Sequence, residues 1–305
     1  MPSQSNPNNI THFGKLSSLE NAARDIKTRI VQRGDLPHAT VDRQIQMVDD
    51  LLKFPLGRFF VEHRGANGYW TDYIINYPYS ITKRKLSDLE DFILKRCPLT
   101  LATRERFKIF QNLIKSELRD NMVLASVPCG CMRDLLEVDF SKYSNFSLIG
   151  IDIDPESLEH ARKLATQKKL NEYTNFILSD AWSLGFESEI DLITSNGLNV
   201  YEPDQKRVLD LYKVFYQSLK PGGILIIGVL TYPPGQYQVS EWKLDLLTED
   251  DMLIETILFQ DILCCNWRNF RTIEEIYKDF YGTGFTKVAI SYDTYHIFPT
   301  VIAIK

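Results

Sequence analysis

The sequence has few of the residue groupings that mark metal and redox sites. Its five cysteines (Cys97, Cys129, Cys131, Cys264 and Cys265) have no zinc-site spacing and form no even-numbered disulfide framework. Unpaired thiols are typical of a reducing compartment. We therefore expect a cytoplasmic protein without a bound metal.

Long apolar runs and an excess of positive charge are missing as well. No apolar stretch reaches the length of a membrane span, and the first residues lack the apolar core of a signal peptide. The formal net charge of the 305 residues is −5, which argues against nucleic acid as the main partner because phosphate binding requires basic surface. With 44% hydrophobic residues, we expect a globular, soluble chain with no membrane partner.

Residues 121–155 have the pattern around which the rest of the chain is organised. A short apolar run ends at a proline, a turn around Gly130 leads into a short amphipathic helix, and a second apolar run (146–151) closes on Asp152. Asp152 falls 22 residues after Gly130, near the spacing of about 20 at which such a carboxylate meets a nucleotide ribose. The segment is therefore a candidate nucleoside-binding βαβ unit. Because Gly-x-Gly-x-x-Gly is absent, a nicotinamide dehydrogenase is disfavoured.

The remaining patterns predict an α/β protein with a helical N-terminal part. Strand and helix patterns alternate after Asp152, which is typical of a doubly wound sheet. The last two apolar runs (285–291 and 297–304) are joined by too short a link for a parallel crossover, so the final strand should run antiparallel. The first 120 residues instead predict helices and loops, the last of these helices starting at Thr103.

The order of these motifs resembles that of the class I S-adenosylmethionine-dependent methyltransferases, over roughly residues 121–305. VLASVPCGC is similar to the family's first glycine motif, IGIDIDP to its ribose acid motif, and LSDAWSL to its adenine-contacting turn. IDLITSNGLNVY resembles the strand that ends beside the methyl group, and LKPGGILII the turn and strand that follow. The resemblance implies a mostly parallel seven-stranded sheet with an antiparallel last strand. It also implies S-adenosyl-L-methionine as cofactor and S-adenosyl-L-homocysteine as product.

The resemblance assigns cofactor contacts to residues of four of these motifs. They are Ser126, Pro128, Cys129, Gly130, Asp152, Ile153, Ser179, Asp180, Ala181, Trp182, Ser195 and Asn196. Asp152 is expected on the ribose and Asp180 on the adenine. Each acid also has a plain structural interpretation as a turn residue, and Trp182 as a core residue.

The first motif departs from the family pattern. Ser126 stands where the family has an acid for the methionine amine, and Gly130 alone remains of three spaced glycines, with Met132 at the third position. A hydrogen bond to a charged group contributes roughly 1.5–3 kcal/mol, against about 1 kcal/mol for a neutral one. Either another residue supplies the charge, or cofactor binding is weakened about tenfold.

The domain organisation and the acceptor site are predicted less directly. Residues 1–120 are expected to form a helical cap whose aromatic stretch, 69–79, closes the cofactor mouth. Residues 121–305 form the methyltransferase domain, in which 231–271 is an aromatic insert on the substrate side. The predicted acceptor contacts are Trp70, Tyr73, Asn199 and Tyr201.

Three functional interpretations remain open on the sequence. The preferred one is methyl transfer to an oxygen or nitrogen atom of a small molecule; the others are a protein or RNA methyltransferase and a non-catalytic cofactor-binding or interaction protein. The Asn-Pro-Pro-Tyr signature of amide and base methylation is absent. A sulfonium methyl is already activated, so a catalytic base is needed only where the acceptor must lose a proton, and none can be named.

Overall fold

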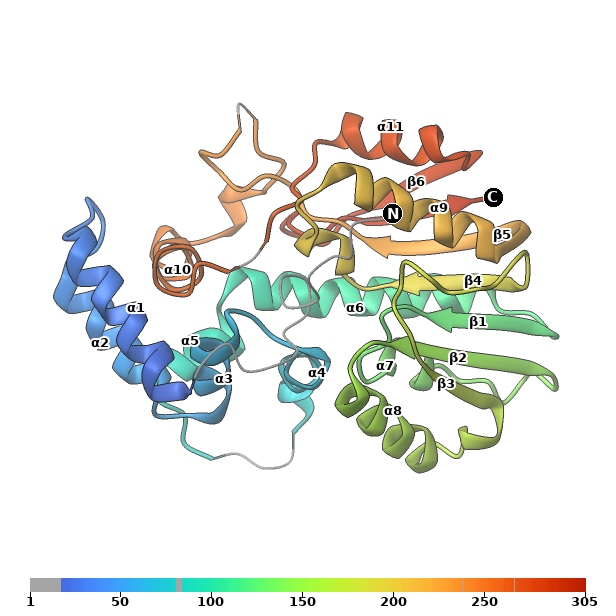
Figure 1. The fold of residues 1–305 in the computed structure, drawn as a ribbon, viewed down its shortest axis with the longest axis horizontal. Helices are drawn as coiled ribbons and strands as arrows, with labels where there is room; N and C mark the ends of the chain where they lie inside the picture. Colours follow the sequence, from blue (N-terminus) through green and yellow to red (C-terminus); the bar gives the residue numbers. More distant parts are fainter. Residues whose placement is uncertain (1–17, 81–83, 238, 266) are drawn as a thin grey trace. The chain divides into compact units, whose positions relative to one another are not determined.

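The computed structural model describes residues 18–80, 84–237, 239–265 and 267–305. The chain forms two compact units, one made of residues up to 101 together with 244–266, and one made of 102–243 and 267–305 (Figure 1). The first unit is helical and the second holds the β-sheet. The boundary of the helical unit thus lies at residue 101, and the central part of the predicted insert 231–271 belongs to that unit.

The helical unit is built from short amphipathic helices with capped N-termini. Its elements are α1 (Leu19–Arg33), α2 (Val41–Leu51), α3 (Pro55–His63), α4 (Gly68–Asn76), η2 (Tyr77–Tyr79), α5 (Asp88–Lys95), η5 (Leu244–Leu246), α10 (Glu249–Glu255) and the π-helical η6 (Thr256–Ile262). Ser18, Thr40 and Ser87 each accept a backbone N–H with their hydroxyl at the start of α1, α2 and α5. Such caps satisfy N–H groups that a helix start leaves free.

The N-terminal helices and the segment 244–266 share one core within this unit. The rings of Phe60 and Phe259 meet edge to face at 5.7 Å. The carboxylate of Glu255 accepts the thiol of Cys97 (3.2 Å) and the N–H of Leu99 (2.8 Å). Leu99 lies in the first turn of α6 (Pro98–Glu117), so the prediction that this helix begins at Thr103 was wrong. Pro98 suits a first helical turn, and a distant carboxylate satisfies the N–H that follows it.

The sheet unit confirms the predicted fold class. Its strands are β1 (Met122–Ser126), β2 (Phe146–Asp152), β3 (Thr174–Leu178), β4 (Ile190–Ser195), β5 (Leu219–Gly228), β6 (Lys287–Ser291) and β7 (Thr300–Ile304). They form one seven-stranded sheet in the order β3-β2-β1-β4-β5-β7-β6. The last strand, β7, pairs antiparallel with both β5 and β6, while the other pairs are parallel, as predicted.

Helices cover the sheet and are buried against it. They are most of α6, then α7 (Arg133–Leu136), α8 (Pro155–Gln167), α9 (Gln205–Ser218) and α11 (Ile273–Thr283), with the short turns η3 (Asn171–Tyr173) and η4 (Leu198–Tyr201). Side chains of α6, α7 and α8 share a core with Ile224 and Ile226 of β5. Because side chains alternate along a strand, buried Leu225 and Ile227 face the other side of the sheet. The polar residues that follow β1, β2 and β4 consequently meet at one edge, where ligands of such sheets bind.

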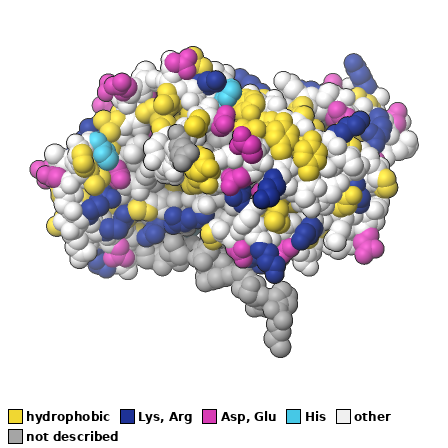
Figure 2. Space-filling view, turned by 90° about the horizontal axis from the view of Figure 1, so that it is seen from above, with side chains coloured by type: hydrophobic (Ala, Val, Ile, Leu, Met, Phe, Trp, Pro, Cys, Tyr) yellow, Lys and Arg dark blue, Asp and Glu magenta, His cyan; other side chains and the backbone are white. Residues whose placement is uncertain are grey.

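The surface carries both charge signs. On the face shown in Figure 2, Lys and Arg side chains occur among Asp and Glu, with hydrophobic side chains between them. No helix in the described ranges is long and apolar enough to cross a bilayer.

Candidate functional site

The turn after β1 is tied to the end of β2. Cys129 donates its N–H to the carbonyl of Ile151 (2.8 Å), and Gly130 donates to Oδ2 of Asp152 (2.8 Å). The other carboxylate oxygen of Asp152 accepts the N–H of Asp154 (3.0 Å). A carboxylate has about four lone-pair sites, so these two N–H groups leave acceptor capacity for ribose hydroxyls. The geometry of Asp152 therefore fits the role expected from the sequence.

Burial sets the electrostatics of Asp152. Desolvation raises the pKa of its carboxyl, although the N–H groups of Asp154 and Gly130 favour the charged form and work against that shift. Hydroxyl donors from a ribose would favour the charged form further. The neighbouring Asp154 caps α8 by accepting the N–H of Glu156 (3.0 Å).

Met132 replaces a family glycine without blocking the turn. It takes the left-handed backbone conformation (φ +55°) that a glycine adopts easily. Its buried side chain occupies the space beside Gly150 of β2. If residue 150 carried a Cβ atom, that atom would lie only 2.9 Å from the Met132 sulfur and 2.8 Å from the Phe176 ring. Because Gly150 has no side chain, β2 leaves room for the Met132 side chain of the turn.

A buried carboxylate that sequence reasoning missed lies next to Ser126. The Ser126 hydroxyl donates to both oxygens of Asp134 (3.0 and 3.2 Å), and the Thr194 hydroxyl donates to one of them (2.5 Å). Ser126 and Thr194 are direct partners across β1 and β4, so Asp134 from α7 binds both strands where they end. The sequence signal for this buried carboxylate was the position of Asp134, which directly precedes the apolar Leu135 and Leu136 in a short amphipathic run.

Asp134 is a strongly desolvated acid. Its side chain is buried, and desolvation raises the pKa of its carboxyl, while the hydrogen bonds from Thr194 and Ser126 favour the charged form. Ser126 stands where the sequence resemblance implies an acid, and this carboxylate accepts its hydroxyl. Asp134 is therefore a candidate source of negative charge at the ends of β1 and β4.

The predicted adenine turn follows β3. The carboxylate of Asp180 accepts the N–H of Trp182 (3.0 Å), which is the turn geometry that such an acid forms locally, and it remains exposed. Trp182 is half-buried, and its indole N–H donates to the carbonyl of Arg207 (2.8 Å) on α9. Ser179 and Ala181 lie in the same turn. The turn is therefore held to the sheet unit by its tryptophan, while the carboxylate stays accessible.

The residues after β4 separate into two groups. Ser195 is buried with no hydrogen-bond partner for its hydroxyl among the described residues, and Asn196 beside it is half-buried. Asn199 instead is 1% exposed, and its amide donates to the phenol oxygen of Tyr212 (3.3 Å) on α9. Tyr201 is half-buried at the end of η4. Asn196 and Tyr201 are thus partly accessible, whereas Ser195 and the amide of Asn199 are buried inside the unit.

Aromatic side chains gather after β5. Tyr232 stacks on Tyr237 (ring centroids 4.7 Å apart) and on Phe270 (5.7 Å). The segment that carries Phe270 is hydrogen-bonded to η4, because the N–H groups of Arg268 and Asn269 both donate to the carbonyl of Val200 (2.8 and 3.1 Å). These contacts bring the outer parts of the predicted insert to the end of β4.

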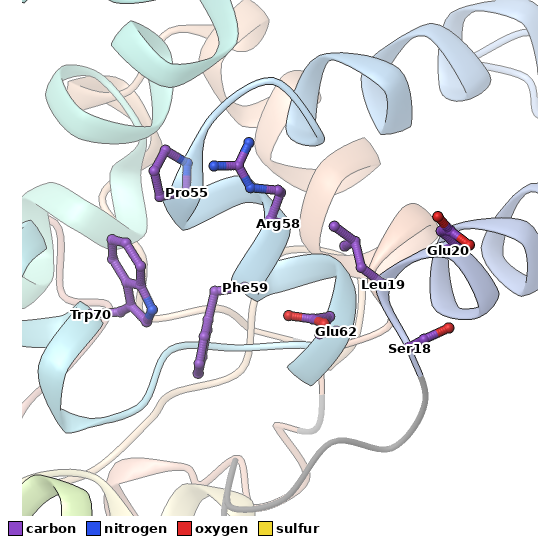
Figure 3. Close-up of a pocket in the computed structure, with 8 residues that line it drawn as sticks. All are labelled: Ser18, Leu19, Glu20, Pro55, Arg58, Phe59, Glu62 and Trp70. Carbon is purple, nitrogen blue, oxygen red and sulfur yellow. The ribbon is translucent and has the colours of Figure 1, made fainter.

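The predicted acceptor residues Trp70 and Tyr73 belong to the helical unit. The two rings meet edge to face at 5.4 Å, and Trp70 also lies 5.9 Å from the ring of Phe59. Phe59 and Trp70 line an open cavity of about 690 Å³ between the start of α1 and helices α3 and α4 (Figure 3). The remaining lining residues are Ser18, Leu19, Glu20, Pro55, Arg58 and Glu62. Closure of residues 69–79 over the cofactor stays a prediction.

Among the described residues, no three His, Cys, Asp or Glu side chains are placed to hold a metal ion. Burial raises the pKa of the Cys129 thiol well above its ordinary value, which disfavours the thiolate. The groups described at this edge are carboxylates, hydroxyls, amides and aromatic rings, which can bind and position a ligand.

Comparison with known proteins agrees with the fold. A sequence model of a methyltransferase domain matches residues 101–275. Among solved structures, a protein of Bordetella parapertussis described as a possible exported protein is 38% identical, with a TM-score of 0.89 over 94% of this chain and 95% of that one. A candidate O-methyltransferase of Nostoc punctiforme is 13% identical, with a TM-score of 0.54 over 98% of this chain and 71% of that one. The latter likeness concerns the fold alone.

One curated protein also resembles part of the chain. The sterol 24-C-methyltransferase of Debaryomyces hansenii is 27% identical over 111 residues. The match covers 36% of this chain and 28% of that enzyme, so it spans less than a third of the relative's length.

Proposed function

Because the chain belongs to the class I S-adenosylmethionine-dependent methyltransferases and uses S-adenosylmethionine as its cofactor, we propose that it methylates an oxygen or nitrogen atom of a small molecule. The observation that carries this proposal is the grouping of stacked aromatic rings, Tyr232, Tyr237 and Phe270, beside the end of β4. An aromatic wall with a few polar groups suits a small, partly apolar acceptor. The sterol methyltransferase likeness is compatible with such an acceptor.

The charge distribution supports the same choice over a nucleic acid. A groove that binds RNA requires clustered basic side chains. The net charge is −5, and on the face shown in Figure 2 acidic side chains occur among the basic ones. Protein methylation remains the alternative that the test below separates.

The proposed cofactor contacts follow the strand ends. When bound, S-adenosylmethionine supplies a methyl group already activated by its sulfonium. In the proposal, Asp152 binds the ribose hydroxyls, Asp180 binds the adenine amino group, and Asp134 supplies the negative charge for the methionine ammonium. The turn at Gly130 positions the first of these acids, since its N–H is hydrogen-bonded to Asp152.

The proposed acceptor contacts come from the other half of the edge. Ser195, Asn196 and Tyr201 provide polar groups after β4, and Tyr232 with Phe270 provides the apolar wall. Holding an acceptor in line with the methyl group contributes up to roughly 7–11 kcal/mol, so positioning alone accounts for a large rate increase. Trp70 and Tyr73 of the helical unit are proposed as further acceptor contacts.

The cofactor assignment is tested by calorimetry with S-adenosylhomocysteine. We expect Asp152→Asn to weaken binding roughly tenfold or more, because hydrogen bonds to a charged acceptor contribute roughly 1.5–3 kcal/mol each. The matched control is Asp139→Asn, which changes an exposed acid of the same unit and should bind as the wild type does. Equal affinity of the Asp152 variant and the wild type would refute the ribose assignment.

The acceptor class is tested by release of S-adenosylhomocysteine across a metabolite library, compared with denatured protein and RNA from a cell extract. We expect turnover with small molecules, and reduced turnover in Asn196→Ala and Tyr232→Ala. Turnover with protein or RNA alone would replace the small-molecule proposal.

A further inference from the structure

A buried arginine that no motif pointed to lies at the acceptor half of the sheet edge. Arg106, on α6, is 8% exposed, and its guanidinium carbon is 4.6 Å from the ring centroid of Phe298. Its side chain also packs on Gly228 at the end of β5, where a Cβ would lie 3.1 Å from the arginine Cδ. The absent side chain at 228 leaves the room that this arginine fills.

The charge of Arg106 lacks a matched partner in the described part of the chain. Its Nε has no hydrogen-bond acceptor there. Asp293 is nearby, but its oxygens already accept the N–H groups of Tyr295, Ile297 and Phe298. A buried cation without a counter-charge is strongly unfavourable, and the Phe298 ring offsets only part of that cost.

The guanidinium stays charged in this setting. Burial lowers the pKa of Arg106 to about 10, and Tyr201 and Asp293 work against that shift. At neutral pH the side chain is therefore a desolvated cation that favours an anion beside it.

Space and further polar groups adjoin this cation. If Gly197, just after β4, carried a Cβ atom, the one atom found within 4 Å of it would be Nη1 of Arg106, at 3.8 Å. The space beside Gly197 is therefore otherwise open. Thr300, which pairs with Gly228 across β5 and β7, has a buried hydroxyl without a hydrogen-bond partner among the described residues. An arginine N–H thus lies beside open space, and a buried hydroxyl without a described partner lies near it at the end of β5, which is a suitable arrangement for binding a carboxylate.

The position of Arg106 favours the acceptor over the nucleotide. Asp152 ends β2, whereas Gly228 ends β5, and the sheet order places β1 and β4 between them. Three strand spacings correspond to about 14 Å. Arg106 therefore lies across the sheet edge from the ribose position, beside Tyr201 and the strand that precedes the aromatic wall.

We propose that Arg106 binds a carboxylate group of the methyl acceptor, so that the substrate is a small organic acid. This inference rests on the proposed small-molecule methylation and narrows it to one substrate class. A planar guanidinium matches a carboxylate with two parallel hydrogen bonds, which a lysine cannot reproduce.

The first test compares small carboxylic acids with their carboxamides as acceptors, by release of S-adenosylhomocysteine. We expect the wild type to prefer the acids, and Arg106→Gln to lower kcat/KM for acids at least tenfold while leaving carboxamides unchanged. Arg106→Lys should retain part of the preference. Lys108→Gln removes an exposed positive charge from the same helix and should behave as the wild type. Equal use of acids and carboxamides by the wild type would overturn the inference and leave small-molecule methylation intact.

The second test does not depend on turnover. With S-adenosylhomocysteine present, benzoate should raise the melting temperature of the wild type and not that of Arg106→Gln, and benzamide should affect neither. If no small molecule is methylated but benzoate still distinguishes the two proteins, the carboxylate site stands while the proposed function fails. Weaker binding of S-adenosylhomocysteine itself by Arg106→Gln would assign the arginine to the cofactor and overturn the inference.

A structural role for the arginine is tested with Arg106→Met. Because the substitution removes an unpaired buried cation and keeps most of the side-chain volume, the melting temperature should stay the same or rise. A clear fall in melting temperature, with acid preference unchanged in Arg106→Lys, would indicate a packing role and contradict the inference.

Discussion

At the scale of single residues, Ser126 occupies the position at which the sequence resemblance implies an acid. Ser126 cannot supply a negative charge, and its hydroxyl donates instead to the buried carboxylate of Asp134. The hydroxyl of Thr194 binds the same carboxylate from the neighbouring strand. The two hydroxyls together hold an acid from α7 at the ends of β1 and β4, so the charge reaches this edge from a different element.

We predict that Asp134→Asn weakens binding of S-adenosylmethionine roughly tenfold, because a charged hydrogen-bond acceptor is replaced by a neutral one. Calorimetry measures the effect, with Glu137→Gln, a partly exposed acid one turn further along, as the control. Ser126→Asp in the Asp134→Asn background should restore affinity, whereas Ser126→Asp alone places two carboxylates in contact and should destabilise the fold. Unchanged affinity in Asp134→Asn would exclude a role in cofactor binding.

At the scale of elements, the helical unit depends on a buried acid at the junction of α10 with the start of α6. The carboxylate of Glu255 accepts from Cys97 and Leu99, and its burial raises its pKa from 4.5 to about 7. The folded unit therefore binds a proton that the unfolded chain releases between these two pH values. The associated stability is fully present below about pH 4.5 and is lost as the pH rises through about 7.

We predict that Glu255→Gln makes the protein less sensitive to alkaline pH. The pKa difference corresponds to about 3 kcal/mol, which the wild type loses between pH 5 and pH 8 and the glutamine variant keeps. Urea unfolding of both proteins at the two pH values measures it. Glu249→Gln, an exposed acid of the same helix, should follow the wild type. A constant stability difference between wild type and Glu255→Gln across this range would contradict the assignment.

At the scale of the whole molecule, the chain divides into a helical unit and a sheet unit. The aromatic side chains of 69–79 are only partly buried, with Tyr69 40% and Tyr79 70% exposed. The helical unit also incorporates residues 244–266, so the chain passes between the two units more than once.

We predict that bound S-adenosylhomocysteine slows amide hydrogen exchange in residues 69–79, because closure over the cofactor would protect them. Hydrogen-exchange mass spectrometry with and without the nucleoside measures this, and α1 provides an internal reference that should not change. Equal exchange of 69–79 in both states would remove the cap from the mechanism.

The sequence by itself determined the fold class, the antiparallel last strand and the order of motifs along the chain. These features are local or nearly so: strand and helix periods, and a link too short for a parallel crossover. The position of Asp152 at the end of β2 follows from the same patterns, because an apolar strand leads directly into it.

Only the tertiary structure decided which distant residues meet. Asp134 and Arg106 stand in amphipathic runs where a charged residue normally faces solvent, and pairing of β1 with β4 and packing of α6 on β5 bury them instead. Likewise, α6 begins at Pro98 because Glu255, 156 residues away from Leu99, satisfies the backbone at its start. The burial of a side chain and its hydrogen-bond partners depend on contacts between segments far apart in the chain. A helical or strand period predicts which residues share a face, but it does not predict which segment packs on that face.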